Sequence, residues 1–293
     1  ELRGVNICYT SKSGLSPFKY VYGLSNDLDL MLDCDVIHTH GMWLHINLAS
    51  LAYARKMGVS SIISPHGMLY PEALNVKALR KSLFWNAMFK SSINRVSCVH
   101  VACEREGELL RHLGVKAPIA VIPHAVEPPR VRNEIEVAKA LNGKRIGFLG
   151  RLDKRKRVDL LVDIWVKYKI DAILIIAGEG DSEYSNYLRA KASGSDRILF
   201  VGFLSGSGKE DFLRSLCALI VPSDFENFGM IILEALSIGT PVIASTGTPW
   251  KVIEDFECGW WVNNETESLI RAIGLALSQS DAQMLKYSIN ASQ

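Results

Sequence analysis

The sequence predicts an α/β protein made of two doubly wound domains with a cleft between them. Short apolar runs alternate with amphipathic segments along the chain, a rhythm typical of parallel strands joined by crossover helices. The 293 residues suffice for two cores of ordinary size, and a polar stretch with prolines, Glu127 to Lys144, separates two halves that share this rhythm. We therefore expect an N-terminal domain over residues 1–128, a linker over 129–144 and a C-terminal domain over 145–293.

Both halves are expected to consist of short strands followed by loops that can hold binding or catalytic residues. In the first half the strand-like runs are Val5–Tyr9, Asp35–His38, Ser61–Ser64, Val99–Ala102 and Ile119–Ile122. In the second half they are Arg145–Leu149, Ala172–Ala177, Ile198–Gly202, Ala218–Val221 and Pro241–Ala244. Doubly wound folds bind ligands at the carboxyl ends of their strands, so the loops after these runs are the places to examine.

The composition indicates a globular protein. Hydrophobic residues make up 48% and charged residues 22% of the chain, and the net charge of +2 argues against a general nucleic-acid binder. No apolar run reaches the ~18 to 20 residues that span a bilayer, and no signal peptide opens the sequence. We expect a cytoplasmic protein.

The stretch from Ile220 to Trp250 is the most informative part of the chain. It predicts a strand, a loop and a short helix that starts near Phe228, with Asn227 as its N-cap and Gly239 as its left-handed stop. The first backbone N–H groups of a helix lack internal partners and, together with the helix dipole, favour an anion. Here they belong to Phe228, Gly229 and Met230.

Two carboxylates flank the start of this helix. Glu226 lies in the loop and Glu234 lies about two turns along, where both suit ligand hydroxyls better than a phosphate that they would repel. A phosphate ester with polyols on both sides, such as a nucleotide sugar, would satisfy the amides and both carboxylates. The plainer alternative is that Glu226 complements the helix dipole and Glu234 is an ordinary surface residue.

Taken as a whole, this stretch resembles the GT-B fold glycosyltransferases of the retaining family 4 group, whose pattern is PS…E.FG…EA…G.PVI.S. The matching residues are Pro222, Ser223, Glu226, Phe228, Gly229, Glu234, Ala235, Gly239, Pro241, Val242, Ile243 and Ser245. The ENFG and GTPW variants are similar to those of bacterial enzymes that build lipopolysaccharide or exopolysaccharide. The resemblance implies two Rossmann-like domains, hexosyltransferase activity and a UDP- or GDP-linked sugar donor, with no metal cofactor.

The resemblance also implies roles for residues of the second half. Arg151 and Lys156 would hold the donor diphosphate, because an Arg fork and a Lys point charge neutralise the leaving group as the glycosidic bond breaks. Glu226 would grip the sugar as a catalytic residue, and Glu234 would accept bonds from the ribose. The expected donor-binding residues are Arg151, Lys156, Asn227, Phe228, Gly229, Met230 and Glu234.

The basic turn after Arg145–Leu149 departs from the family at one position. Arg157 stands where a glycine is usual, which leaves Lys154 or Arg155 as substitutes for Lys156. A solvated basic turn that binds nothing is the plain alternative.

Two histidine-containing loops follow strands of the first half. In the family a histidine at such a strand end approaches the donor sugar and phosphate; His66 matches it and would be catalytic, with Gly67 allowing close backbone approach. His40 and Gly41 match a neighbouring loop on the acceptor side. A polar loop residue without a role is the alternative for His66.

A metal is a weaker interpretation of the same region. His38, His40 and His45 could suggest one, but no Cys or carboxylate completes a set of three or four ligands.

The segment Lys77–Arg95 is basic and contains no acidic residue. It predicts either a core-packing helix with a solvated basic face, or a peripheral contact with an anionic membrane that brings the protein to a lipid-linked acceptor. Two Gly-rich stretches, residues 177–184 and 206–211, lack the glycines of a dinucleotide or phosphate loop, and the second predicts a turn before a helix. The turn Gly202–Leu204 is expected to line the base pocket, as the corresponding family loop does.

The expected function is transfer of a sugar from a nucleotide diphosphate donor to a growing bacterial surface glycan or lipid-linked saccharide, in the cytoplasm or at the inner face of the plasma membrane. A GT-B sugar-nucleotide epimerase and an inactive donor-binding or scaffold subunit are the alternatives. The family's first strand with its Gly-rich loop, and its final crossover helix, are expected to be missing from this chain.

Overall fold

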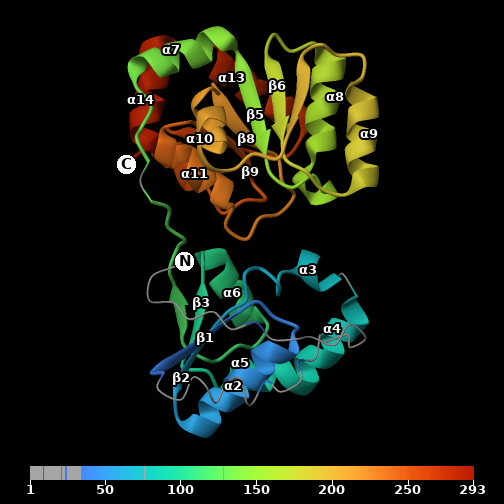
Figure 1. The fold of residues 1–293 in the computed structure, drawn as a ribbon, viewed down its shortest axis with the longest axis vertical. Helices are drawn as coiled ribbons and strands as arrows, with labels where there is room; N and C mark the ends of the chain where they lie inside the picture. The colour runs from blue at the N-terminus through green and yellow to red at the C-terminus, as the bar shows by residue number, and fades with distance from the viewer. Residues whose placement is uncertain (1–8, 10–20, 22–23, 25–33, 76, 128) are drawn as a thin grey trace. The chain divides into compact units, whose positions relative to one another are not determined.

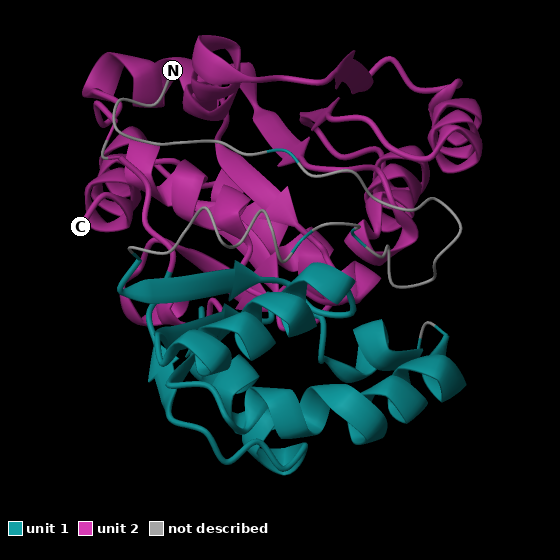
Figure 2. Cartoon of the chain, turned by 60° about the horizontal axis from the view of Figure 1, so that its bottom comes forward, with its two compact units in different colours: residues 1–123 teal, residues 124–293 magenta. Residues whose placement is uncertain are grey.

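The computed structural model describes residues 9, 21, 24, 34–75, 77–127 and 129–293. It divides the chain into two compact units, Glu1–Pro123 as unit 1 and His124–Gln293 as unit 2 (Figure 2). Each unit holds its own parallel sheet with helices packed against it (Figure 1), which confirms the predicted α/β class. The expected strand Val5–Tyr9 lies outside the described residues except for Tyr9.

Unit 1 is built on a four-stranded parallel sheet in the order β1-β2-β3-β4. Its strands are β1 (Val36–His40), β2 (Ser60–Ser64), β3 (Cys98–Val101) and β4 (Ile119–Val121). Its helices are α2 (His45–Met57), α3 (Pro71–Asn75), α4 (Ala78–Phe84), the π-helix η1 (Trp85–Phe89), α5 (Lys90–Ile93) and α6 (Glu104–His112). Because all strands are parallel, their carboxyl ends and the loops that follow them lie along one edge of the sheet.

The basic segment Lys77–Arg95 is helical and passes through α4, η1 and α5 in succession. In its second half, Phe89 and Ile93 are each 1% exposed, as a core-packing helix requires. On α4, by contrast, Leu79 is 91% and Leu83 is 67% exposed. The first half of the segment therefore presents an apolar and basic surface. No helix in the described part of the chain is both long and apolar enough to cross a membrane.

Unit 2 contains a six-stranded parallel sheet in the order β10-β9-β8-β5-β6-β7. Its strands are β5 (Arg145–Leu149), β6 (Ile173–Ala177), β7 (Ile198–Gly202), β8 (Ala218–Val221), β9 (Val242–Ser245) and β10 (Gly259–Val262). The strand order reverses at β5, which pairs with β6 on one side and with β8 on the other. Doubly wound sheets bind ligands outside the carboxyl ends of the strands at such a switch point.

Helices cover both faces of this sheet (Figure 1). They are α7 (Glu134–Gly143), the 3-10 helix η2 (Lys154–Lys156), α8 (Val158–Tyr168), α9 (Ser182–Ala192), α10 (Gly206–Arg214), α11 (Met230–Ile238), α12 (Val252–Asp255), α13 (Thr266–Leu277) and α14 (Asp281–Ala291). α8, α9 and α13 share one core with the sheet, in which Leu161, Ile164 and Phe148 are buried. α7, α10, α11 and α14 pack with one another.

Two features of unit 2 differ from the expectations. The stretch 129–144, expected to be a linker, contains α7, which starts with a capping box between Asn133 and Glu136 and packs against α14. Such a box satisfies two backbone donors and stabilises a helix, a signal that the nearby prolines obscured. The edge strand β10 was not anticipated, because a run of four residues that begins with Gly259 gives little periodicity.

Candidate functional site

The loops after β5 and β8 meet at the switch point of unit 2 because these two strands are neighbours in the sheet. The first loop carries Arg151 and η2, and the second carries Glu226. Two motifs that are about 70 residues apart in the chain thus form one surface. This is the position at which doubly wound sheets bind their ligands.

Lys156 and Glu226 form an ion pair at this point. The Lys156 ammonium donates to Glu226 Oε1, and the Ser223 hydroxyl donates to the same oxygen at 2.7 Å. The two side chains are only 17% and 13% exposed, so the pair is largely withdrawn from water. Removing either partner would leave a poorly hydrated charge, which is costly. The pair therefore holds a cation and a hydrogen-bond acceptor side by side at the switch point.

Arg151 is more open to solvent. Its Nε donates to Asp153 Oδ2 at 3.0 Å, and its side chain is 67% exposed. Asp153 also caps η2, since its Oδ1 accepts the N–H of Arg155 at 3.0 Å. Asp153 thus fixes both the turn and the arginine that precedes it.

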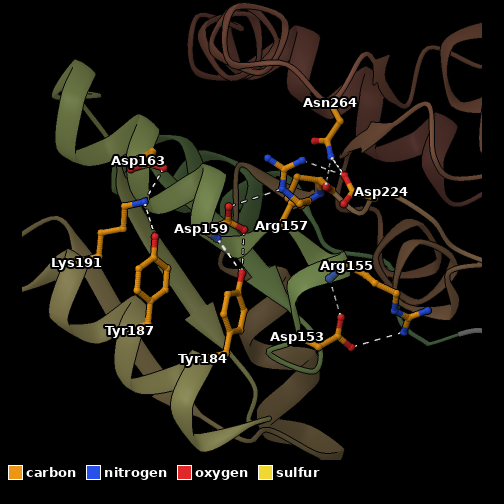
Figure 3. Close-up of polar contacts among 11 residues, drawn as sticks. Asp153, Arg155, Arg157, Asp159, Asp163, Tyr184, Tyr187, Lys191, Asp224 and Asn264 are labelled. Atoms are coloured by element: carbon orange, nitrogen blue, oxygen red, sulfur yellow. Dashed lines mark hydrogen bonds and ion pairs between the residues drawn. The ribbon is translucent and has the colours of Figure 1, made fainter. Parts of the chain in front are cut away.

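Asp224 ties the two loops together. Its carboxylate oxygen Oδ1 accepts Arg157 Nη1 and Asn264 Nδ2, each at 3.0 Å (Figure 3), and its N–H donates to the Arg155 carbonyl at 2.8 Å. Arg157 has a left-handed backbone with φ 51, a conformation that favours glycine. A non-glycine residue there costs roughly 1 kcal/mol, which the contacts of the Arg157 guanidinium with Asp224 and Asp159 offset.

Glycines let these loops pack backbone against backbone. A Cβ on Gly178 would lie 1.9 Å from the Gly150 carbonyl oxygen, and a Cβ on Gly247 would lie 2.3 Å from that of Asp224. The Gly-rich stretch 177–184 therefore supports the loop after β5. The same logic explains why the loop after β9 can press on the loop after β8.

Helix α11 begins later than the sequence indicates. Gly229 has φ 83 and is the N-cap, so the helix starts at Met230. The prediction that Asn227 is the N-cap was wrong, because a left-handed residue between Asn227 and the helix interrupts the helical backbone. Of the amides expected to face an anion, only that of Met230 lies in the first helical turn. Gly239 ends the helix with φ 89, as predicted.

Phe228 anchors the loop instead. It is 9% exposed, and its ring lies 5.2 Å from those of both Trp250 and His124. Its carbonyl also accepts the indole N–H of Trp250. The aromatic residue is thus held by packing, and any contribution from it to a ligand must come from the backbone.

Glu234 has a partner that the sequence analysis missed. Lys209 on α10 contacts its Oε2 at 2.9 Å, and the two side chains are 29% and 26% exposed. Lys209 lies in the stretch 206–211, which was expected to be a turn before a helix and instead forms the first part of α10 itself. Nothing in the local sequence connects it to Glu234, because the contact depends on how α10 packs against α11.

A cavity of about 910 Å³ lies beside the basic turn. Its lining holds more acidic than basic side chains and two tyrosines: Asp153, Lys154, Arg157, Asp159, Asp181, Glu183, Tyr184, Tyr187 and Asp224. The Tyr184 hydroxyl donates to Asp159 Oδ1 at 2.9 Å (Figure 3), and burial together with this bond raises the pKa of Tyr184. The acidic lining repels a diphosphate, so the Lys156 side of the turn suits that group better.

In unit 1, His40 and His66 meet at the carboxyl ends of β1 and β2. His40 Nδ1 and His66 Nε2 are 2.9 Å apart, and the nearly parallel rings have centroids 5.2 Å apart. His66 and Gly67 both have left-handed backbones, with φ 52 and 73. The N–H of Gly41, which has φ 80, donates to the Ser64 carbonyl at 2.8 Å. The structure therefore brings together the residues singled out in these two loops.

Glu106 is a further site residue that the sequence analysis missed. It is 1% exposed, and its carboxylate accepts the N–H of Gly67 at 2.6 Å and that of Ala102 at 3.4 Å. The sequence shows only an acidic residue in the first turn of α6, which is common because it complements the helix dipole. In the fold this carboxylate fixes the loop that carries His66.

A second chain of polar contacts runs behind these histidines. Ser64 Oγ lies 2.8 Å from His38 Nε2 and 2.7 Å from His100 Nδ1, and His100 Nε2 lies 2.8 Å from the Ile122 carbonyl. Burial, followed by the charges of His40 and His100, lowers the pKa of His38. His38 is therefore kept neutral at physiological pH.

The histidines considered as metal ligands serve separate contacts. His38 contacts Ser64, His40 contacts His66, and His45 Nδ1 accepts the N–H of Val21 at 3.4 Å. Within the residues that the structure describes, no group of three or more His, Cys, Asp or Glu side chains is arranged to hold a metal ion.

Comparison with known proteins assigns both units. Residues 131–293, more than half of the chain, match the family described as glycosyl transferases group 1. The chain belongs to the glycosyl transferases group 1 family. Residues 5–130 match the description glycosyltransferase family 4. The matched regions meet close to the boundary between units 1 and 2.

Two curated relatives of this group 1 family member are named as mannosyltransferases. The phosphatidyl-myo-inositol mannosyltransferase of Mycobacterium leprae is 28% identical over 267 residues, which is 87% of this chain and 67% of that protein. The lipopolysaccharide core biosynthesis mannosyltransferase LpsB of Rhizobium meliloti is 33% identical over 145 residues, 44% of this chain and 40% of that protein. Across the first curated relatives the matched regions span 38% to 67% of the relative's own length.

Solved structures share the fold of the chain. The HepE protein of Anabaena, in complex with UDP and glucose, superposes with a TM-score of 0.74 at 17% identity, over 92% of this chain and 75% of that one. At this identity the likeness concerns the fold, and it supports the predicted GT-B class with two Rossmann-like domains.

Proposed function

We propose that this chain is a retaining glycosyltransferase that moves a sugar from a UDP- or GDP-linked donor to a growing bacterial surface glycan or a lipid-linked saccharide. The observation that carries the proposal is the Lys156–Glu226 pair at the switch point of unit 2. A cation beside a carboxylate suits a ligand with an anionic leaving group and a polyol. The names of the mycobacterial and rhizobial relatives, and the UDP and glucose bound to HepE, support the same substrate classes.

In this proposal donor binding divides the Lys156–Glu226 pair between two parts of the ligand. Lys156 turns to the diphosphate, with the exposed Arg151 as a second donor, and Glu226 accepts hydrogen bonds from sugar hydroxyls. Ser223 keeps Glu226 in place during this exchange, because its hydroxyl already donates to Oε1 at 2.7 Å. Charge-assisted bonds to the departing phosphate stabilise the negative charge that develops there.

Glu234 binds the ribose in the same scheme. Its second oxygen remains an acceptor while Lys209 holds Oε2 at 2.9 Å. The backbone N–H of Met230, in the first turn of α11, adds a donor for the diphosphate. Asn227, Phe228 and Gly229 contribute through the loop backbone that precedes the helix.

In unit 1, His66 stabilises the charge that develops at the sugar and phosphate, and His40 and Gly41 belong to the acceptor side. Transfer proceeds on one face of the sugar: the acceptor oxygen bonds to the anomeric carbon, the bond from that carbon to the phosphate oxygen breaks, and the acceptor proton passes to the leaving phosphate. This route needs no nucleophile from the protein.

The protein works at the inner face of the plasma membrane in this proposal, with α4 as the contact. Leu79 and Leu83 present apolar surface, and Lys77, Arg80 and Lys81 supply positive charge on the same segment. Exposed apolar residues beside basic ones bind anionic lipid surfaces. Leu79→Asp should therefore release the protein from sedimenting vesicles of phosphatidylglycerol, whereas vesicles of phosphatidylcholine should not bind either form.

The first test is thermal unfolding with UDP, GDP, ADP and CMP, each in excess. A ligand at ~100 times its dissociation constant adds about 2.7 kcal/mol to the folded state, enough to raise the melting temperature by a few degrees. We expect one nucleoside diphosphate to stabilise the chain and Glu234→Ala to abolish that shift. No shift with any of the four would contradict a donor site in unit 2.

The second test is transfer from the matching sugar nucleotide to a lipid-linked acceptor. Glu226→Ala should reduce transfer by roughly 100-fold or more. Glu257→Ala is the matched control, because Glu257 pairs with Lys286 on the surface with both side chains more than half exposed. An epimerase would instead convert the sugar nucleotide into its epimer without any acceptor. A scaffold subunit would bind the sugar nucleotide without cleaving it, so no nucleoside diphosphate would be released.

A further inference from the structure

His40 and His66 are placed against each other by the backbone of two neighbouring strands. β1 and β2 pair in parallel with His40 opposite Ser64, so the loops that leave them start side by side. The N–H of Gly41 donates to the Ser64 carbonyl at 2.8 Å and ties the two loops together directly after the strands. The distance of 2.9 Å between His40 Nδ1 and His66 Nε2 follows from this register.

The backbone around His66 is held from a second side. His66 and Gly67 are both left-handed, a conformation that costs a non-glycine residue about 1 kcal/mol. The buried Glu106 carboxylate accepts the Gly67 N–H at 2.6 Å, a charge-assisted bond that stabilises this turn. Glu106 thus fixes where the His66 ring starts, and the ring contact with His40 fixes where it points.

The contact constrains protons as well as position. A neutral imidazole has one N–H donor and one acceptor nitrogen, so one proton must lie between the two rings. A histidine side chain in water favours the tautomer with the proton on Nε2. When both rings keep that tautomer, His66 Nε2–H donates to His40 Nδ1, and the proton arrangement needs no unusual form of either ring.

We propose that His40 is a positioning residue for His66: it accepts the His66 Nε2–H, and thereby fixes the orientation and the tautomer of the ring that acts on the donor. The proposal rests on the proposed function of His66. The arrangement follows the general rule that a functional base or acid is oriented by a third group. When His66 carries a proton on both nitrogens, the same bond becomes charge-assisted and stabilises the cation.

The other titratable groups that face the pair come from β1, β3 and α6. The ring of His38 lies 4.2 Å from that of His40, the ring of His100 lies 6.0 Å from that of His38, and Glu106 lies behind the His66 loop. Burial, followed by the charges of His40 and His100, lowers the pKa of His38. Burial thus favours the neutral form of His38 beside the pair.

The test compares His40→Asn with His40→Phe. The side-chain oxygen of Asn can take the place of Nδ1 as acceptor, whereas Phe keeps a ring of similar size without one. His112→Asn is the control, because His112 is exposed and its Nδ1 lies 2.8 Å from the Glu108 carbonyl of its own helix. Melting temperatures identify any variant that fails to fold.

The first readout is independent of activity. Long-range proton–nitrogen NMR spectra of the histidine rings should show His66 as a single Nε2–H tautomer in the wild type and in His40→Asn, and as a tautomer mixture in His40→Phe. An unchanged His66 signal in His40→Phe would overturn the proposal.

The second readout is transfer. We expect His40→Phe to lower kcat on the order of tenfold to a hundredfold with donor KM unchanged, as loss of a partner that orients a functional histidine does, and His40→Asn to recover most of it. An unchanged kcat in His40→Phe would overturn the positioning role in transfer. If His66→Ala transferred at the wild-type rate while the NMR result held, the proposed role of His66 would fail and the structural pairing would stand.

Discussion

Each unit has a polar site at the carboxyl ends of its strands, and the two sites are held together by different kinds of contact. In unit 2 the loops are tied by ion pairs, Lys156 with Glu226 and Arg157 with Asp224. In unit 1 the contacts at the corresponding edge of its own sheet join imidazoles to one another and to a hydroxyl. His40 contacts His66, and His38 contacts Ser64. Both sites lie at the carboxyl ends of strands in parallel sheets, so the parallel-sheet architecture does not dictate this difference.

Because the two sites are held by different kinds of contact, they should differ in the substitutions that they withstand. The unit 2 contacts are ion pairs, so that site should be sensitive to the removal of one charge. The unit 1 contacts join imidazole nitrogens and a hydroxyl, so that site should be sensitive to the loss of a single hydrogen-bonding atom.

The largest effect is expected from Lys156→Met. This change removes the cation proposed for the diphosphate and leaves the Glu226 carboxylate, 13% exposed, without its partner. We expect kcat/KM for transfer to fall by roughly 100-fold or more. Lys286→Met, which removes the cation of an exposed pair, should leave it unchanged. Activity within twofold of the wild type in Lys156→Met would show that this cation does not serve the reaction.

A smaller effect is expected from Lys209→Met. Losing the contact at 2.9 Å frees the Glu234 carboxylate to move, and a charged hydrogen bond is worth about 1.5–3 kcal/mol at most. Donor KM should rise by roughly tenfold with little change in kcat. The control is Lys191→Met, whose ammonium contacts Asp163 at 2.7 Å between two other helices. A fall in kcat without a change in KM would contradict a role in ribose binding.

The free energy of unfolding should decrease as pH falls, in two separate pH windows. His38 has a pKa below 6.5, because burial disfavours its charged form; the folded state then binds fewer protons than the unfolded state, and stability is lost as pH falls below 6.5. In unit 2 the hydrogen bond from Arg130 lowers the pKa of Glu136 to about 2, so its contribution is lost only as pH falls from 4.5 toward 2. Melting temperatures measured against pH should show that His38→Gln flattens the first window and Glu136→Gln the second. If the loss of stability below pH 6.5 persisted in His38→Gln, it would have to come from another group.

The smallest effect is expected from Arg157→Gly. The variant loses ion pairs in which the Arg157 and Asp224 side chains are 33% and 49% exposed, which are worth about 0.2–1 kcal/mol. It also relieves the left-handed strain at φ 51, a gain of similar size. The free energy of unfolding in urea should therefore change by less than about 1 kcal/mol. A loss of several kcal/mol would show that this arginine, and not the glycine-compatible backbone, holds the turn.

Local sequence patterns predicted the order of strands and helices and most strand positions. β5, β7 and β8 have the bounds that their apolar runs predict. β8 is buried along its whole length, as a parallel strand covered on both faces requires, whereas β7 lies at the edge of the sheet with Leu199 and Val201 each 45% exposed. Gly239 was recognised as a helix stop for an equally local reason, since its φ of 89 suits glycine. The sequence also singled out Lys156, Glu226 and His66 as candidates. Each of these signals depends on neighbours along the chain.

Which of these residues contact one another depends on the tertiary fold. The order β8-β5 brings Glu226 to Lys156, the packing of α10 on α11 brings Lys209 to Glu234, and the register of β1 on β2 brings His40 to His66. The left-handed Gly229, which moves the start of α11 to Met230, belongs to a loop anchored by the aromatic ring of Trp250. Such contacts join residues far apart in the chain, and local periodicity and capping preferences carry no information about them.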